Sequence, residues 1–379
     1  MSYIEINDRC VGCSACAQIC AAGAITMKRD AEGFLYPSVE ESLCTDCAAC
    51  KDICCVTEVS HLDSLEQAYY GWHLDDSVRF DSSSGGLFTA LAQCILNKNG
   101  VVFGAVQDGK DFVYRSTNET DLSAMRKSKY TEIDPADSFR QVRTYLKQNQ
   151  WVLFCGTPCR VAGLKKFLKR PYSTLITVDF VCGGVASPAF LWEDIHALER
   201  KYKSNLTQID FRSKKNGWGG QHMCQLSFEN GKKKHILARE DAYFTAFLAK
   251  KINRKSCYQC QFVENHFSDI TMADFWDYKK ISNLKNDRKG MSMWVVHTQL
   301  GGEILRDCEK MLVINPMDYS VVAGNFTRTG HYEKKRKERD AFCARAEQEG
   351  FVSASKSYMK KTEILMFKIK NIIKSVLHK

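Results

Sequence analysis

Apolar and polar residues follow two different periods along this chain, which divide it into short strands and one-sided helices. Residues 151–154 and 175–181 are mainly apolar runs, typical of buried strands. Between them, residues 160–168 place apolar side chains three and four positions apart, which predicts an amphipathic helix. A strand, a helix and a second strand in this order predict a β-α-β unit with parallel strands.

The same periods extend the predicted fold on both sides of this unit. Residues 87–96 have helical periodicity, and residues 100–106 are an apolar run that predicts another buried strand. Further strands are expected around residues 69–72 and over residues 270–276. Strands that alternate with helices are typical of an α/β sheet, which binds ligands at the carboxyl ends of its strands.

Cysteine changes this picture, because the 379-residue chain contains 18 cysteines. The first residues lack the basic start and apolar run of a secretory signal peptide, and no apolar run approaches the roughly 20 residues of a membrane span. We therefore expect a cytoplasmic protein whose cysteines bind metal rather than form disulfides. The length predicts two or three domains.

Charge is distributed unevenly. The net charge is +10, yet acidic residues outnumber basic ones within the first 60 residues. The basic residues are dispersed, and no helix-turn-helix, zinc-finger or RNA-binding motif is found. The sequence therefore predicts no nucleic-acid partner.

Two copies of one cysteine spacing occupy the N-terminal region. Each copy is Cys-x2-Cys-x2-Cys-x3-Cys. Three thiolates at this spacing hold three irons of a 4Fe–4S cluster, and the fourth ligates the other cluster. Paired zinc sites do not favour this run. One cluster is therefore assigned to Cys10, Cys13, Cys16 and Cys54, and the other to Cys44, Cys47, Cys50 and Cys20.

The segment between the copies supports a small ferredoxin-type domain over residues 1–62. Residues 24–27 and 33–37 fit the two short strands of a hairpin. The proline that usually follows each fourth cysteine is replaced by Ala21 in one copy and by Cys55 in the other. Such a domain passes single electrons, so the bond chemistry is expected in the rest of the chain.

A further set of cysteines follows the predicted β-α-β unit. Cys159 lies in the turn after one strand, and Cys182 follows the next strand at the same sheet edge. Cys257 and Cys260 have a spacing that chelates one metal centre. We interpret these four residues as ligands of a third 4Fe–4S cluster, with Cys155 as a competing ligand. Structural zinc is the alternative, because four cysteines also suit zinc.

A serine–glycine turn opens the predicted helix over residues 87–96. Backbone N–H groups of Ser84, Gly85 and Gly86 favour a phosphate at that position, although an ordinary serine cap fits the same residues. No Gly-x-Gly-x-x-Gly follows a strand, so a nicotinamide-dinucleotide unit is not predicted. Candidates for binding an anionic substrate are three basic residues farther along: Lys129, Arg212 and Lys214.

The last part of the chain, residues 331–379, is predicted to be a basic helical tail. Residues 331–339 form a charged helix or a solvated run. From Lys356 onward, apolar residues share one helical face among many lysines. This pattern fits either peripheral contact with an anionic membrane or packing on the protein's own body.

These motifs together resemble the coenzyme F420 hydrogenase/dehydrogenase beta subunit family over about residues 1–300. The resemblance implies an FAD-containing iron–sulfur oxidoreductase, and some relatives act on the deazaflavin coenzyme F420. Bacterial members with fused ferredoxin modules often occur among polysaccharide-biosynthesis genes. The matching segments are the double cysteine repeat, the Ser-Gly-Gly turn, Ser128-Lys-Tyr130, Cys155-Gly-Thr-Pro-Cys159, Asp179–Pro188, Phe211-Arg-Ser-Lys214 and Cys257-x2-Cys260.

The resemblance also implies roles for individual residues. It places the flavin diphosphate at the Ser-Gly-Gly turn, with Ser128, Lys129 and Tyr130 nearby, and the inner cluster at the four cysteines from Cys159 to Cys260. Two positions depart from the family: Gly183 replaces its usual histidine and Arg160 its usual glutamine. Both lie near the expected flavin and substrate.

The predicted fold class is therefore mixed, α+β and α/β: the ferredoxin-type domain, then an α/β domain over residues 63–330 with FAD and the inner cluster, then the helical tail. Electrons from ferredoxin or a similar donor are expected to pass through the clusters to FAD and on to a small organic acceptor. The alternatives are an F420-dependent hydrogenase/dehydrogenase beta subunit or a non-catalytic electron-transfer subunit of a larger complex. Oligomer formation is compatible with each.

Overall fold

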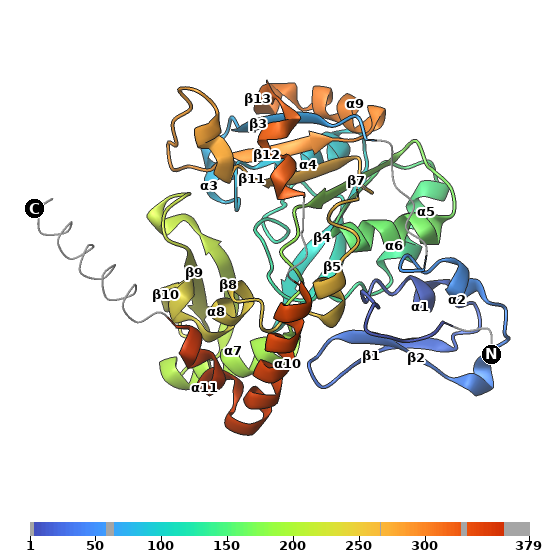
Figure 1. Cartoon of the computed structure of the whole chain (residues 1–379). Coiled ribbons are helices and arrows are strands. Elements are labelled where there is room, and N and C mark those ends of the chain that lie inside the picture. The colour runs from blue at the N-terminus through green and yellow to red at the C-terminus, as the bar shows by residue number, and fades with distance from the viewer. Residues whose placement is uncertain (1–3, 58–63, 266, 327–331, 360–379) are drawn as a thin grey trace, which may run out of the picture.

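An eight-stranded mixed sheet forms the centre of the molecule (Figure 1). The computed structural model describes residues 4–57, 64–265, 267–326 and 332–359. The strand order across the sheet is β13-β3-β12-β11-β7-β6-β4-β5. In chain order its strands are β3 (Gln67–His73), β4 (Val101–Asp108), β5 (Asp111–Thr117), β6 (Val152–Cys155), β7 (Leu175–Phe180), β11 (Ile270–Asp274), β12 (Ser292–Val296) and β13 (Leu312–Met317).

The middle of this sheet is parallel and its outer strands are antiparallel. β4, β6, β7 and β11 pair in parallel, with Phe154 opposite Thr177 and Asp179 opposite Thr271. Helix α6 (Pro158–Leu168) connects β6 to β7. The predicted β-α-β unit and the mixed α/β fold are therefore confirmed.

Helices cover both faces of the sheet, so central strands such as β6, β7 and β12 are buried, whereas the outer strands are partly exposed. On one face, α4 (Leu87–Asn97) and α9 (Gln299–Asp307) share a core with Ile176 and Trp294. On the other face, α5 (Ser138–Lys147) and α6 pack against Phe154. A short helix, α3 (Asp76–Phe80), precedes the serine–glycine turn and α4.

The N-terminal module, residues 4–57, lies beside α5 and α6 (Figure 1). Its two strands pair antiparallel with Met27 opposite Pro37, which is the hairpin that the sequence predicts. Helix α1 contacts both α5 and α6, so the cysteine-rich segment is held against the main sheet. The elements of the module are α1 (Ala15–Ile19), β1 (Ile25–Arg29), β2 (Leu35–Val39) and α2 (Ala49–Asp52).

A three-stranded sheet and its helices form the remaining part of the body (Figure 1). The strands are β8 (Leu206–Ser213), β9 (Met223–Phe228) and β10 (Lys233–Leu237), and the helices are α7 (Pro188–Tyr202), α8 (Ala242–Leu248), α10 (Tyr332–Glu349) and α11 (Phe351–Ser355). Phe190, Phe342 and Phe351 share one core here, so the segment after residue 331 begins with helices that pack on the body.

The amphipathic helix predicted from Lys356 onward lies mostly outside the described residues. Within the described ranges, no helix is both long enough and apolar enough to cross a membrane.

Candidate functional site

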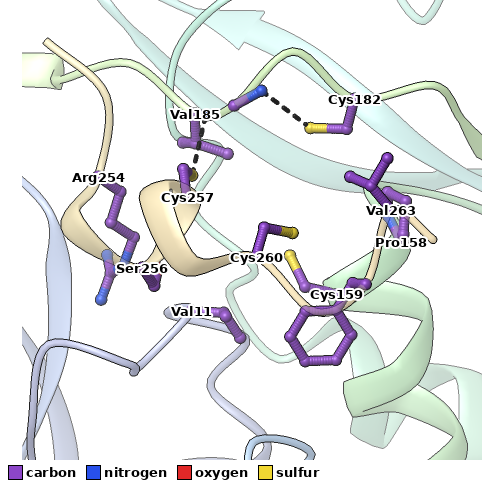
Figure 2. Close-up of a pocket in the computed structure, with 12 residues that line it drawn as sticks. Val11, Pro158, Cys159, Cys182, Val185, Arg254, Ser256, Cys257, Cys260 and Val263 are labelled. Atoms are coloured by element: carbon purple, nitrogen blue, oxygen red, sulfur yellow. Dashed lines mark hydrogen bonds between the residues drawn. The ribbon is translucent and has the colours of Figure 1, made fainter. Parts of the chain in front are cut away.

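Four cysteines from three separate segments line one pocket at the edge of the parallel strands (Figure 2). Cys159 lies in the first turn of α6, and Cys182 lies in the loop after β7. Cys257 lies in a 3-10 helix over Lys255–Gln259, and Cys260 follows that helix directly. The fold therefore brings together all four cysteines of the predicted inner site.

The parallel topology explains why these segments meet. β6 and β7 are neighbours whose carboxyl ends share one edge, so the turn after β6 and the loop after β7 lie side by side. Pro158 begins α6 and places Cys159 at that edge. A bridge between Ala186 and Asn253 brings the third segment against the loop after β7.

Backbone N–H groups point at two of the sulfurs. The N–H of Gly184 lies 3.4 Å from Sγ of Cys182, and the N–H of Val185 lies 3.3 Å from Sγ of Cys257. Gly184 has a φ of +103°, and a Cβ atom there would lie 2.1 Å from Nδ2 of Asn253, so only glycine fits. Hydrogen bonds to sulfur are one means by which proteins set the potential of an iron–sulfur cluster.

Burial governs the electrostatics of this pocket. It raises the pKa of Cys257 to about 12 and the pKa of Cys159 well above the ordinary thiol value. Val11, Phe262 and Val263 supply apolar lining. A thiolate in such surroundings needs a compensating cation, which metal coordination supplies. Across the described ranges, no three His, Cys, Asp or Glu side chains gather tightly enough to hold a single metal ion.

Cys155 is not among the residues that line the pocket. Side chains alternate along β6, so Phe154 packs with α6 whereas Cys155 packs with the core under α4 on the opposite face. Burial raises the pKa of Cys155 to about 12. The geometry favours Cys159 over Cys155 as the residue that faces the other three cysteines.

In the N-terminal module, Cys54 joins the first three cysteines of the repeat. Burial raises the pKa of Cys16, and the nearby thiols of Cys13, Cys10 and Cys54 raise it further. Cys54 is the fourth cysteine of the second copy of the repeat, yet it lies beside the first copy. The spacing predicts this arrangement, in which the fourth cysteine of each copy serves the other cluster.

The other four cysteines of the repeat differ in exposure, from the buried Cys50 to the exposed Cys47. Cys20 and Cys50 belong to a small apolar cluster with Ile25. Cys44 follows the short 3-10 helix of residues 41–43. Cys47 is exposed, and a hydrogen bond from the N–H of Ala49 lowers its pKa.

The module lies directly against the four-cysteine pocket. A Cβ atom on Gly163 of α6 would lie 2.8 Å from Cβ and 2.9 Å from Sγ of Cys13, so this glycine permits the close approach. Sγ of Cys55 lies 3.8 Å from the backbone oxygen of Cys159. A hydrogen bond from Cys55 also lowers the pKa of Cys13 to about 7. Cys55, which stands where proline is usual, therefore bridges the two regions.

The segments predicted to hold the flavin also meet. Ser83 accepts hydrogen bonds from the backbone N–H of Ser128 at 2.8 Å and from its hydroxyl at 3.0 Å. Arg212 donates to the backbone oxygen of Ser83 at 3.4 Å and to the hydroxyl of Tyr130 at 3.1 Å. The serine–glycine turn, residues 128–130 and the end of β8 thus form one continuous surface.

Within the serine–glycine turn, two of the predicted groups bond to the main sheet. The hydroxyl of Ser84 donates to the backbone oxygen of Met291 at 2.5 Å, and the N–H of Gly85 donates to Oγ of Ser292 at 2.8 Å. Gly86 begins α4 with a φ of +93°. The hydroxyl of Ser84 and the N–H of Gly85 are therefore already bonded within the protein.

Three cations approach this surface in different ways. Arg212 forms a two-pronged ion pair with Asp274, with nitrogen–oxygen distances of 2.8 and 3.1 Å. Lys214 donates to the backbone oxygen of Ser84 at 2.6 Å, and burial lowers its pKa to about 7. Burial likewise lowers the pKa of Lys129 to about 7, and its ammonium group donates to backbone oxygens of its own loop.

Three residues help to position these sites through ion pairs that no local sequence pattern predicts. Asp274 ends a predicted strand, but its partner Arg212 comes from another sheet. Arg254 and Glu132 form an ion pair at 2.7 Å with both side chains 1% exposed. Arg254 stands three residues before Cys257, and this short separation is the sequence feature that places it close to the pocket.

Two family models match this chain. The N-terminal model of the coenzyme F420 hydrogenase/dehydrogenase beta subunit matches residues 68–139, and the C-terminal model of that subunit matches residues 149–320. A chain of the F420-reducing NiFe hydrogenase complex from Methanosarcina barkeri is a structural neighbour with 13% sequence identity and a TM-score of 0.46, and the match covers 75% of this chain and 93% of that chain. No curated protein matches this chain.

Proposed function

The chain belongs to the coenzyme F420 hydrogenase/dehydrogenase beta subunit family, and from that premise we propose that it is an iron–sulfur flavoprotein that transfers electrons between a one-electron partner and coenzyme F420. The observation that carries this proposal is the four-cysteine pocket, which lies against an N-terminal module with two further sets of four cysteines. A protein that stored or sensed metal would need no such contact between cysteine sets.

In this proposal Cys159, Cys182, Cys257 and Cys260 hold an inner 4Fe–4S cluster. Four cysteines around one buried pocket, with backbone N–H groups aimed at two sulfurs, fit the donor set of such a cluster. When bound, clusters supply one-electron transfer and FAD supplies the exchange between one and two electrons.

The N-terminal module contributes the other two proposed clusters. Its ligands are Cys10, Cys13, Cys16 and Cys54 for one cluster, and Cys44, Cys47, Cys50 and Cys20 for the other. The exposed position of Cys47 supports entry of electrons from an external partner at the second set. The contact between Cys13 and Gly163 supports exit toward the pocket from the first set.

FAD is proposed to bind at the surface formed by the serine–glycine turn, residues 128–130 and the end of β8. Ser84, Gly85 and Gly86 would lie along its diphosphate, with the first N–H groups of α4 nearest to the charge. Ser128, Lys129 and Tyr130 would lie beside it, and Arg212 and Lys214 add positive charge. Burial lowers the pKa values of Lys129 and Lys214 to about 7, so an anion bound beside them would favour their charged forms.

The family match favours F420 as the two-electron partner over reduction of another organic acceptor with electrons from ferredoxin. Two observations favour the second candidate. The cysteine repeat within this chain gives a ferredoxin-like entry for single electrons, and Gly183 and Arg160 depart from the family beside the expected acceptor. A role in polysaccharide biosynthesis belongs to this second candidate.

Anaerobic purification with iron, sulfide and flavin measured per chain tests the cofactors. We expect about twelve irons, about twelve sulfides and about one FAD, because three four-iron clusters are proposed. About eight irons with one zinc would contradict the inner cluster and support a structural metal site in its place.

Oxidation of reduced F420 by the purified protein tests the partner. We expect bleaching of the bound flavin in step with F420 oxidation. Absence of any response, together with turnover of another acceptor by ferredoxin-reduced protein, would replace the F420 proposal with the second candidate. Absence of turnover with either partner would leave an electron-transfer subunit that depends on another chain.

A further inference from the structure

Arg254 lies between the proposed inner cluster and the nearer cluster of the N-terminal module. Its side chain is 1% exposed, and the residue lines the four-cysteine pocket (Figure 2). Its Nε donates to the backbone oxygen of Cys10 at 2.8 Å, and its Nη2 lies 3.7 Å from Sγ of the same cysteine. The Arg254 side chain therefore starts at the pocket, and its guanidinium group contacts the nearer cysteine loop of the N-terminal module.

The remaining contacts of Arg254 hold the N-terminal module in place. Nη2 donates to the backbone oxygen of Leu35 at 2.9 Å, and the guanidinium carbon lies 4.0 Å from the ring centre of Tyr36. Nη1 pairs with Glu132 at 2.7 Å, and the other oxygen of Glu132 accepts the N–H of Leu35 at 2.7 Å. A buried arginine with all of its nitrogens bonded stays charged.

The loop around Cys10 is shaped to reach this ion pair. Gly12 has a φ of +65°, and a Cβ atom at this position would lie 2.9 Å from Oε1 of Glu132 and 3.0 Å from Nη1 of Arg254. Only glycine combines this backbone conformation with so close an approach. The cysteine loop, the arginine and the carboxylate are therefore packed as one unit.

A buried charge at this position acts on both sites at once. Gain of an electron makes a cluster more negative, so a nearby positive charge stabilises the reduced form and raises the reduction potential. The carboxylate of Glu132 partly cancels this field. Both charges lie in a region with little water to screen them.

We propose that Arg254 is a positioning residue that raises the reduction potentials of both adjacent clusters, and that Glu132 limits this effect. The inference rests on the proposed function, because it requires clusters at the two cysteine sets. It assigns a role to a residue outside the ligand and flavin sets.

The test is an anaerobic redox titration followed by electron paramagnetic resonance, with the full-length wild type, Arg254→Gln, Glu132→Gln and Arg339→Gln. Arg339 is the matched control. It is buried, bonds the backbone oxygen of Asn253 at 3.0 Å and pairs with Glu32 of the hairpin. It thus anchors the same module without contacting a predicted ligand among the described residues.

The two test variants should shift the potentials in opposite directions. Arg254→Gln should lower them and Glu132→Gln should raise them, each changing the one-electron equilibrium at least tenfold, or about 59 mV. Arg339→Gln should leave both potentials unchanged. If the ion pair were purely structural, the reduction potentials would shift in the same direction in both variants or would not shift at all. Either result would overturn the proposal.

Iron content separates the remaining outcomes. If Arg254→Gln loses iron, its potentials cannot be compared with those of the wild type. The Glu132→Gln variant then tests the proposal: a rise in the reduction potentials supports it, and a fall or no change overturns it. Loss of iron in both variants assigns the pair a structural role alone and overturns the proposal. A wild type without cluster iron overturns the proposed function itself, whereas a wild type with about twelve irons and unshifted variants overturns only the role of Arg254.

Discussion

The two cysteine-rich regions of this molecule are built in opposite ways. In the N-terminal module, eight cysteines between Cys10 and Cys54 follow one short repeat, and they lie in two short helices and the loops beside them, on either side of a hairpin. In the pocket, four cysteines from Cys159 to Cys260 meet because a parallel sheet brings strand ends to one edge. The ligands of a local repeat can be assigned from their spacing in the sequence, whereas a pocket of distant residues exists only once the sheet has formed.

The two regions also differ in their exposure to water. The module includes Cys47, which is exposed, and both of its cysteine sets contribute to one small apolar cluster. In the pocket, burial raises the thiol pKa values of Cys159 and Cys257. Cysteine ligands in a buried pocket depend on the metal to stay ionised. Loss of metal should therefore change the protonation state of the pocket cysteines more than that of the exposed cysteines of the module.

The largest effect is expected from a change to the pocket itself. Cys257→Ala should lower the iron content from about twelve to about eight per chain, because a single cluster loses a ligand. Electron transfer to the acceptor should fall by more than the roughly 10- to 100-fold that loss of an outer-sphere partner causes. Iron analysis and anaerobic turnover are the measurements.

Cys155→Ala is the matched control, since Cys155 is a partly buried cysteine near the same sheet edge that does not line the pocket. It should retain about twelve irons. Equal iron loss in both variants would mean that Cys155 is a ligand, and iron loss beyond four atoms in Cys257→Ala would mean that the two regions do not assemble independently.

A smaller effect is expected at the contact between the regions. Gly163→Ala places a Cβ atom 2.8 Å from Cβ of Cys13, so the cysteine loop before α1 must shift away from α6. Overpacking of this kind costs about 1–3 kcal/mol, which urea unfolding under anaerobic conditions can measure. Reduction of the acceptor should also slow while the iron content stays the same.

Gly302→Ala in α9 is the control for this change. A Cβ atom there has its nearest neighbour at 3.8 Å, the end of the Arg306 side chain. In a helix interior, alanine in place of glycine should stabilise by about 0.5–1 kcal/mol. If the two variants have the same free energy of unfolding, the close contact between Gly163 and Cys13 does not hold the module in place.

The smallest effect is expected from the burial of Asp179 at the sheet edge, which should make the free energy of unfolding depend on pH. Burial raises the pKa of Asp179 to about 7, and Thr271 Oγ1 donates to its Oδ1 at 2.5 Å. In the unfolded chain this carboxyl ionises near its ordinary pKa. Its stabilising contribution is therefore complete below about pH 4 and is lost as the pH rises through about 7.

Asp179→Asn removes this titration while keeping an oxygen that accepts from Thr271. Between pH 6 and pH 8.5 the free energy of unfolding of the variant should fall less than that of the wild type, by on the order of 1 kcal/mol. Lys165, Asp269 and Ser268 also act on this carboxyl and are present in both proteins. Parallel pH profiles in urea unfolding would show that water reaches Asp179.

Much of the fold could be predicted because its strands and helices are locally patterned. The strand at residues 151–154 and the helix at residues 160–168 appear as β6 and α6, shifted by one or two residues. The parallel pairing with β7 followed from the connection through α6. The packing of α10 and α11 onto the body was not predicted, since their apolar residues are few and their partners lie on α7 and α8.

The sequence by itself determined which residues are suited to bind metal. Repeated cysteine spacing within a few residues of chain fixes how thiolates can surround a cluster, so the eight N-terminal assignments needed no fold. It also marked the four distant cysteines as candidates. It left Cys155 and Cys159 as competitors, because both lie in one turn.

Only the tertiary structure decided the rest. Alternation along β6 turned Cys155 to one face, while α6 placed Cys159 in the pocket. The packing of the module placed Cys13 against Gly163 and inserted Arg254 between the two regions. The physical reason is that burial and electrostatic coupling depend on distances in space between residues that no local pattern relates.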